Sequence, residues 1–308
     1  MRWYGFDSET HQQVDPSQFS DYLDVRKRAY VLVGGRHQFF PKRELDTIDY
    51  SIEDTYQGLY QQLRGYLGKA KKGKSKKDES ASTPADELKY ARYGLHNYVQ
   101  KEKQKREPYA SLHRAGYSLR GLIRILLFKR FESSVYAFKE TIRRLILVHE
   151  RFLKALAEGI VPAGEDAQAI LYEPNESEER ALMDALRQVS NRYDIKDFDS
   201  EKLKADIGHD LKLLQKILQL VAPITPEQDA KLQKLKSVLA KKPLKDGKRL
   251  IFTQYADTAK YLHDNLNPGG WRDDIDVIFS GDKSKARIVG RFAPKANPAR
   301  MRKMSFST

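Results

Sequence analysis

The sequence predicts an α-rich α/β protein, and two patterns in the chain carry this prediction. Between residues 88 and 240, apolar side chains recur at spacings of three and four, which is typical of amphipathic helices. Between residues 247 and 292, a short apolar run twice leads into a polar loop and then a helical pattern, which is typical of βα units. We therefore expect a large helical region followed by two βα units.

The first 67 residues mix extended and helical patterns. A strand is predicted at residues 29–33, where Ala-Tyr-Val-Leu-Val is followed by two glycines. A second extended piece is predicted at residues 45–52. A helix capped by Asp54 or Thr55 is expected to follow and to continue to Leu67.

Residues 68–87 form a lysine-rich loop that has almost no apolar side chain to bury, and we expect it to be disordered. Within it, Gly68–Ser75 reads GKAKKGKS and satisfies the phosphate-loop pattern G-x-x-x-x-G-K-S. A working phosphate loop lies between a buried strand and a helix, whereas here a helical pattern precedes the motif and KKDESAS follows it. We interpret the match as chance in a Lys/Gly tract and expect no nucleotide site there.

The helical region contains apolar stripes within residues 119–127 and 135–156. The opposite face is basic, and it is either solvated or faces phosphates: Arg120, Arg124, Lys129, Arg130, Arg143, Arg144 and Arg151. An acidic stretch at residues 165–201, with a short helix near residues 178–189, is expected to form a hinge or an outer edge. Helices are predicted at residues 200–221 and 229–240. Between them, Thr225 is expected to be a helix cap, with Pro226 at the first helical position.

The composition and net charge limit which partners, metal sites and cellular locations the sequence is compatible with. The net charge of +14 favours a polyanionic partner, with nucleic acid ahead of an anionic membrane, although charge alone also serves solubility. The chain has no cysteine, which excludes disulfides and thiolate metal sites, and its seven histidines show no metal-ligand spacing. No apolar run could span a bilayer and the start does not read as a signal peptide, so we expect a cytoplasmic protein with no membrane partner.

Several segments resemble Swi/Snf-type superfamily II DNA helicases and translocases. Lys248–Tyr255, KRLIFTQY, is similar to the strand that opens the second motor lobe of this family, and Gly281, Arg287 and Phe292 resemble positions in the loop and helix that follow. Residues 40–60 resemble the exit from the first lobe. Residues 129–138 resemble the helical insert of a bacterial branch.

The resemblance implies a fold and a domain order. Residues 1–67 would be the end of a first RecA-like lobe with a connecting helix, and residues 68–87 a disordered loop. Residues 88–245 would be the helical insert. Residues 246–308 would be the truncated start of the second RecA-like lobe, comprising its first two βα units.

The resemblance also implies a function. Intact relatives use ATP and Mg²⁺ between the lobes to move along DNA, but the family's phosphate loop, acidic box and arginine fingers have no counterpart in this chain, which holds no cofactor or metal site of its own. The loops at residues 253–254 and 280–285 would face the phosphate backbone, since hydroxyls, amides and lysines are the usual phosphate contacts. The candidate nucleic-acid-binding residues are Thr253, Gln254, Ser280, Gly281, Lys283, Ser284, Lys285, Arg287 and Arg291.

Three functions compete. The first is a fragment of an ATP-dependent DNA motor that binds DNA without sequence preference and works with the missing motor parts or another protein. The second is a non-enzymatic, basic, helical nucleic-acid-binding or adaptor protein. The third, which we consider the weakest, is a nucleotide-hydrolysing enzyme built on GKAKKGKS.

We predict that the purified chain has no ATPase activity above background, with or without DNA, because the phosphate-binding and acidic elements that perform catalysis in this class are missing. A phosphate-release assay checks this. Turnover that disappears on Lys74→Ala would contradict the prediction and restore the loop motif as a nucleotide site.

Overall fold

The computed structural model describes residues 30–33, 36–39, 45–68, 87–164, 166, 188, 190 and 193–294. The chain divides into two compact units, Met1–Asp49 and Tyr50–Thr308. In the first unit, β1 (Tyr30–Val33) and β2 (Arg36–Phe39) form an antiparallel hairpin in which Tyr30 is opposite Phe39. The strand predicted at residues 29–33 is therefore present, whereas the extended piece predicted at residues 45–52 forms no strand.

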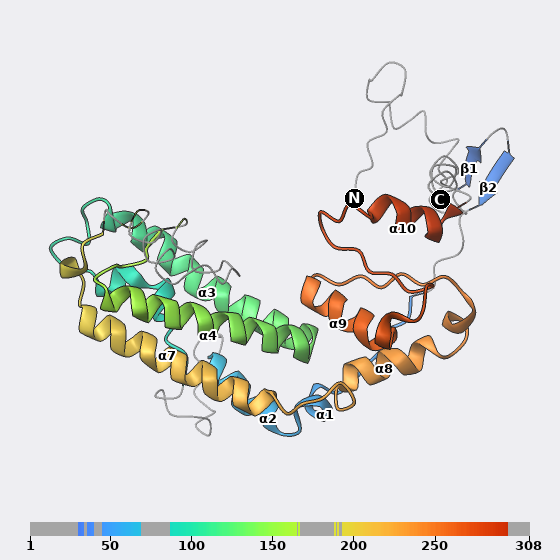
Figure 1. Ribbon diagram of the computed structural model, residues 1–308, viewed down its shortest axis with the longest axis horizontal. Coiled ribbons are helices and arrows are strands. Elements are labelled where there is room, and N and C mark those ends of the chain that lie inside the picture. The colour runs from blue at the N-terminus through green and yellow to red at the C-terminus, as the bar shows by residue number, and fades with distance from the viewer. Residues whose placement is uncertain are drawn as a thin grey trace, which may run out of the picture. The chain divides into compact units, whose positions relative to one another are not determined.

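The second unit is helical (Figure 1). Its α-helices are α1 (Ile52–Tyr56), α2 (Leu59–Leu67), α3 (Tyr109–Ser133), α4 (Val135–Ala157), α7 (Ser200–Val221), α8 (Ala230–Leu239), α9 (Ala256–Leu266) and α10 (Lys285–Phe292). Short 3₁₀ helices are η3 (Ala91–Tyr93), η4 (Leu95–Tyr98), η5 (Ile195–Asp197), η6 (Leu244–Asp246) and η7 (Pro268–Gly270).

Side-chain caps set where several helices begin. Ser134 ends α3 and begins α4, because its backbone is extended and its hydroxyl accepts a hydrogen bond from the Ala137 amide at 3.1 Å. Asp229 caps α8 by accepting from the Leu232 amide at 3.1 Å. The cap predicted at Thr225 is therefore wrong by one turn, since residues 225–228 form a turn ahead of the helix.

The core lies along α4 and α7, which contribute to both hydrophobic clusters of the unit. In one cluster, Phe152 packs with Leu203 and Ile207 from the start of α7. In the other, Phe138 lies with residues from the second half of α7, including Ile217, and with α2 and the end of α3. All of these side chains are fully buried. Burial of each stabilises the fold by about 1.5–3 kcal/mol.

Residues 88–108, which we predicted to be largely helical, form short 3₁₀ turns and an irregular loop. The buried Asp210 on α7 explains this conformation, because its carboxylate accepts hydrogen bonds from the Lys89 amide at 2.6 Å and the Ala91 amide at 2.9 Å. These amides are therefore bonded to α7 and make no helical hydrogen bond of their own. The Leu88 amide also donates to the Tyr66 carbonyl at 2.9 Å, which holds both ends of the 68–87 loop together.

The predicted α/β fold class is wrong for the described chain. Residues 248–255 and 276–280 form no strand, and β1 and β2 are the only strands among the described residues. The two helices predicted after these runs are present as α9 and α10. An apolar run becomes a buried strand only when other strands pair with it, and here the run instead leaves Leu250 at 63% and Phe252 at 88% exposure.

The described residues contain no helix that is both long enough and apolar enough to cross a membrane.

Candidate nucleic-acid interface

The turn before α10 holds most of the predicted phosphate-contacting residues. Gly281 has a φ of 82°, in the left-handed region that glycine favours. The Asp282 carboxylate accepts from the Ser284 amide at 2.7 Å, so the turn is closed by Asp282. Ser284 stands at the cap position of α10, but its side chain makes no capping hydrogen bond.

The cations at this turn fall into two groups. Lys283, Lys285 and Arg287 are exposed, and no ion pair holds them to any residue that the structure describes. Arg291, by contrast, forms an ion pair with Asp276 at 3.1 Å and donates to the Asp273 carbonyl. Hydrogen bonding from Ser284 lowers the pKa of Asp282, so one negative charge persists beside the exposed cations.

Thr253 and Gln254 are exposed in the segment that precedes α9. Across the described part of the chain they share no hydrogen bond with the turn at residues 280–287. Lys248, which precedes the first loop, contacts the end of α10. Its ammonium donates to the Phe292 carbonyl and lies 5.4 Å from the centre of the Phe292 ring. Among the described residues, therefore, no hydrogen bond links the two predicted loops directly.

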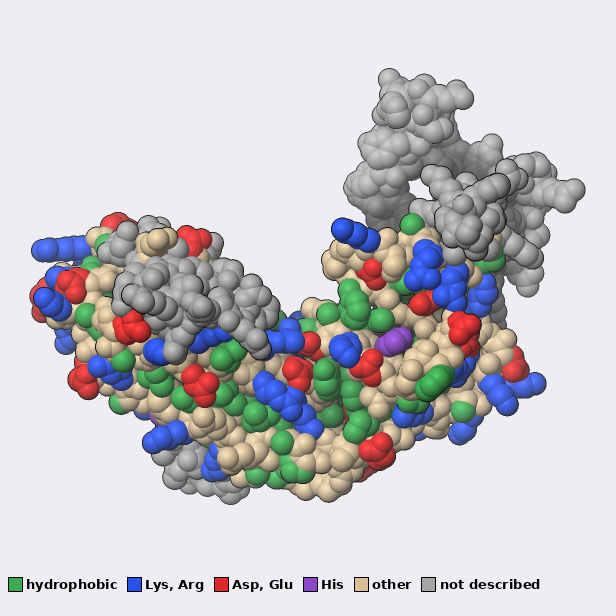
Figure 2. Space-filling view, viewed as in Figure 1, with side chains coloured by type: hydrophobic (Ala, Val, Ile, Leu, Met, Phe, Trp, Pro, Cys, Tyr) green, Lys and Arg blue, Asp and Glu red, His purple; other side chains and the backbone are tan. Residues whose placement is uncertain are grey.

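The basic face predicted on α3 and α4 is largely paired with acids. Arg124 forms an ion pair with Glu87 at 3.0 Å, and Arg143 pairs with Glu140. Lys129 is exposed, and Arg120 lies in a stretch whose side chains are outside the described set. Figure 2 shows the result, with Asp and Glu interspersed among the Lys and Arg side chains of the face in view.

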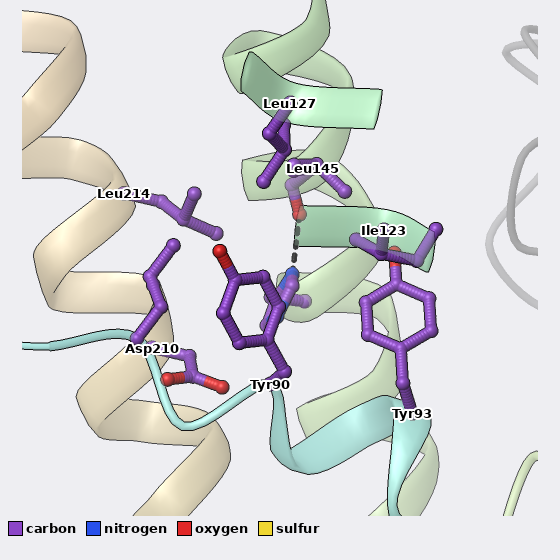
Figure 3. Close-up of a pocket in the computed structure, with 9 residues that line it drawn as sticks. Tyr90, Tyr93, Ile123, Leu127, Leu145, Asp210 and Leu214 are labelled. Atoms are coloured by element: carbon purple, nitrogen blue, oxygen red, sulfur yellow. Dashed lines mark hydrogen bonds between the residues drawn. The ribbon is translucent and has the colours of Figure 1, made fainter. Parts of the chain in front are cut away.

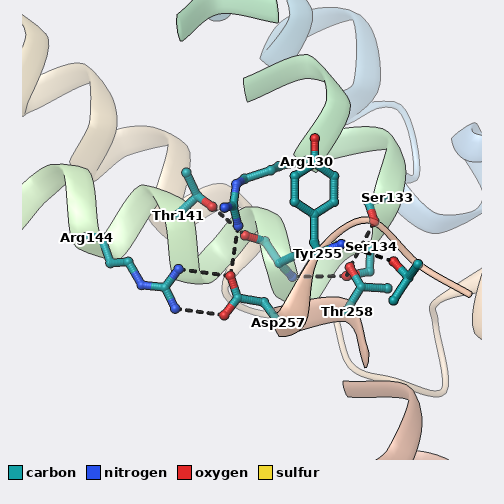
Figure 4. A network of polar contacts seen from close by, with 10 residues as sticks. Arg130, Ser133, Ser134, Thr141, Arg144, Tyr255, Asp257 and Thr258 are labelled. Atoms are coloured by element: carbon teal, nitrogen blue, oxygen red, sulfur yellow. Dashed lines mark hydrogen bonds and ion pairs between the residues drawn. The ribbon is translucent and has the colours of Figure 1, made fainter. Parts of the chain in front are cut away.

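Asp257, in the first turn of α9, joins two of these arginines (Figure 4). Arg144 on α4 donates to both carboxylate oxygens, at 2.9 and 2.7 Å, and Arg130 on α3 donates to one of them at 2.8 Å. We call Arg130, Arg144 and Asp257 the Asp257 cluster. Arg144 and then Arg130 hold the pKa of Asp257 below its usual value, while Asp257 raises the pKa of Arg144.

Neighbouring groups surround the Asp257 cluster. The Arg130 guanidinium lies 4.6 Å from the centre of the Tyr255 ring, a cation–π contact. The Thr258 hydroxyl is within hydrogen-bonding distance of the Ser133 and Ser134 hydroxyls, at 2.8 and 3.0 Å. The first turn of α9 is thus attached to the point where α3 ends and α4 begins.

The far part of α9 has its own attachment. The Tyr261 ring stacks on Tyr136 of α4 with centroids 5.4 Å apart, and its hydroxyl donates to Asp229 at 3.0 Å. Burial and the negative charge of Asp229 raise the pKa of Tyr261, so it remains a hydrogen-bond donor at neutral pH. Sequence patterns gave no sign of this contact, because it joins residues far apart in the chain.

Two lysines of the second unit donate hydrogen bonds to carbonyl groups at the C-terminal ends of helices. The Lys139 ammonium donates to the Ala222 and Ile224 carbonyls beyond α7, at 3.0 and 2.6 Å. Lys231 donates to the Glu132 and Ser133 carbonyls at the end of α3, at 3.0 and 2.9 Å. A cation at a helix C-terminus stabilises the unpaired carbonyls there. These lysines therefore stabilise the fold and are not available to an outside anion.

A small pocket lies between α3, α4, α7 and the 88–93 loop of the second unit (Figure 3). Its volume is about 10 Å³, enough for a single water molecule. His149 lines it, and its Nδ1 is 2.7 Å from the Leu145 carbonyl oxygen. Burial lowers the pKa of His149 to about 4, so the ring is neutral at pH 7 and acts as a core residue. Among the described residues, no group of His, Asp or Glu could hold a metal ion.

The motif GKAKKGKS lies outside the described residues except for Gly68. Residues 40–43 and the tail after residue 294 also lie outside them, as does the helix predicted near residues 178–189 except for residue 188. The element before the motif is helix α2, and a phosphate loop would need a strand there. The chain matches no protein-family model, no curated protein and no solved structure.

We predict that Asp257→Asn lowers the free energy of unfolding at pH 7 by about 1.5–3 kcal/mol, the range for hydrogen bonds to charged groups. Because the pKa of Asp257 is lowered in the folded state, its carboxylate stabilises the fold at every pH above its usual pKa of 3.8. This contribution is lost as the pH falls through the folded-state pKa. The difference in free energy of unfolding between wild type and variant should therefore reach its maximum above pH 5 and decrease below pH 4. Urea unfolding measures this difference.

Asp264→Asn is the matched control, because it removes one carboxylate from the same helix and breaks an exposed pair with Lys260. An exposed pair contributes about 0–1 kcal/mol. Equal effects of the two substitutions at pH 7 would contradict the role assigned to Asp257.

Proposed function

We propose that this chain binds nucleic acid through the phosphate backbone, without reading base sequence. The observation that carries the proposal is the contrast between two sets of cations. Arginines of α3 and α4 are paired with carboxylates of the chain, whereas Lys283, Lys285 and Arg287 are exposed and lack such partners among the described residues. A net charge of +14 adds long-range attraction to a polyanion.

The turn before α10 offers the groups that contact phosphates. Ammonium and guanidinium groups neutralise phosphate charge, and the exposed Ser280 hydroxyl can donate to a phosphate oxygen. The N-terminus of α10 adds a partial positive charge beside them. Asp282 opposes this attraction, which limits the affinity. We expect about three to six phosphate contacts and micromolar or weaker binding at physiological salt.

The helical body supports the non-enzymatic reading, a basic helical nucleic-acid-binding or adaptor protein in the cytoplasm. The described chain after residue 50 forms helices, turns and irregular loops, and the pocket between α3, α4 and α7 is too small for a nucleotide. In this reading the helices position the α10 turn, and no chemistry is required of the chain.

A second candidate is that the chain is a piece of a Swi/Snf-type DNA motor whose other parts hold ATP and Mg²⁺. The exposure of Leu250, Ile251 and Phe252 favours it. An apolar run of this kind is unfavourable in water, at about 25 cal/mol for each Å² left uncovered, and contact with another part of a motor would bury it. Both candidates share the phosphate-binding turn.

We predict that Lys283→Ala with Lys285→Ala weakens binding to duplex DNA of any sequence alike. Purely electrostatic binding falls linearly with log salt, with a slope of about −0.9 for each phosphate neutralised. Loss of two contacts should flatten the slope by about two. Fluorescence anisotropy with two unrelated 20-base-pair duplexes, from about 50 to 200 mM salt, measures both quantities.

The control variant is Lys101→Ala with Lys105→Ala, which removes the same charge from exposed positions in the 100–108 loop. It should change affinity only slightly and leave the slope within one unit of wild type. If the two double variants behave alike, net charge alone explains binding and the α10 turn is not the contact surface.

A further inference from the structure

The Asp257 cluster has the arrangement of an anion site with a carboxylate already bound. Two guanidinium groups from different helices converge on one carboxylate, and Arg144 donates two parallel hydrogen bonds to it. The planar guanidinium fork matches phosphate as well as carboxylate in this geometry. The anion in the cluster is supplied by the chain itself, from a residue 113 positions along from Arg144.

The charges of the cluster do not cancel. Arg130 and Arg144 contribute +2 and Asp257 contributes −1, so a net charge of +1 remains. The nearest other acid on α4, Glu140, is engaged with Arg143. A phosphodiester group would meet the same two guanidiniums with more acceptor oxygens, and the duplex it belongs to would add neighbouring phosphates.

Solvent reaches the cluster. The Arg144 side chain is 50% exposed, while those of Arg130 and Asp257 are 27% and 18% exposed. Arg130 is held in place by its contact with the Tyr255 ring. The two cations are therefore positioned at the surface, where a large polyanion can approach Arg144 first.

The first turn of α9 can separate from the cluster without the whole helix leaving. Tyr255, at the cap position, makes no side-chain capping hydrogen bond, and the residues before it are exposed. The contacts to be broken at this turn are those of Asp257 with the two arginines, those of the Thr258 hydroxyl, and that of the Tyr255 ring with Arg130. The stacked Tyr261, about one turn beyond Asp257, remains as an anchor.

We propose that Arg130 and Arg144 form a second phosphate site of this protein, which Asp257 occupies in the absence of nucleic acid and yields to a backbone phosphodiester. This inference rests on the proposed function, because it names a further contact for the same polyanion. Asp257 then lowers the affinity for nucleic acid, and its ion pairs stabilise the unbound form.

The test is the affinity of the full chain for a 20-base-pair duplex, measured by anisotropy over a salt series. Asp257→Asn removes the competing carboxylate and keeps the side-chain shape. It should tighten binding about three- to tenfold and steepen the salt slope by about one, the value for one additional phosphate contact. Asp264→Asn makes the same change in net charge on the same helix and should change affinity less than twofold.

Double variants test whether the gain in affinity for the duplex comes from the Asp257 cluster. Adding Arg144→Gln to Asp257→Asn should cancel most of the gain, whereas adding Arg143→Gln, which removes a neighbouring arginine paired with Glu140, should preserve it. The proposal is overturned if Asp257→Asn binds no more tightly than Asp264→Asn, or if its gain survives Arg144→Gln.

If Asp257→Asn does not fold, as shown by circular dichroism, the single variants decide. Arg144→Gln in the wild-type chain should then weaken binding more than Arg143→Gln, and equal effects overturn the proposal. The proposed function fails separately: if the wild-type chain shows no salt-dependent binding even at about 50 mM salt, that function is excluded and this inference with it. If the wild type binds and Asp257→Asn matches Asp264→Asn, only this inference fails.

Discussion

Burial of the apolar face of α4 is the constraint on which the rest of the second unit depends. From Val135 to Leu156 this face lies in the core, and it contributes to both hydrophobic clusters. Helix α7 runs beside it and supplies Leu203, Ile207 and Ile217 to the same core (Figure 1). Because one face of α4 is buried, its arginines must project from the opposite side.

Those arginines explain how α9 is attached. Arg144 lies midway along α4 and Arg130 near the end of α3, and both guanidinium groups reach the same carboxylate of Asp257. Like charges at that distance repel unless an anion lies between them. Asp257 provides the anion, and Thr258 adds hydroxyl contacts to Ser133 and Ser134. The same electrostatic requirement that attaches α9 also makes the pair attractive to an external phosphate.

Local patterns in the sequence predicted several of the helices, although residues 88–108 do not form the helix that was expected. The predicted helices at residues 200–221 and 229–240 correspond to α7 and α8, and the helical patterns after the two apolar runs correspond to α9 and α10. Helical periodicity is a local property, so one segment suffices to show it. A strand depends on a partner elsewhere in the chain, and the run at Leu250–Phe252 has no partner among the described residues. The α/β prediction failed for this reason.

Within the candidate site, too, features that depend on local sequence could be predicted, whereas pairings between distant residues could not. The exposed turn at Lys283–Arg287 could be predicted from local composition, because turn residues and cations are adjacent in the sequence. The pairing of Arg130 with Asp257 spans 127 positions, and that of Lys139 with the end of α7 spans more than 80. Neither pairing leaves a local signal, so the basic face of α3 and α4 looked available to phosphates from sequence alone.

Hydrogen–deuterium exchange of the full chain tests most directly the claim that this is a helical protein with unpaired apolar runs. Amides of α4 from Ile142 to Phe152 should be strongly protected, since they are hydrogen-bonded within a buried helix. Amides of Leu250–Phe252 and Val277–Phe279 should exchange at rates close to those of an unstructured peptide. Protection of these two runs equal to that of α4 would mean that they are paired strands, and it would contradict the account.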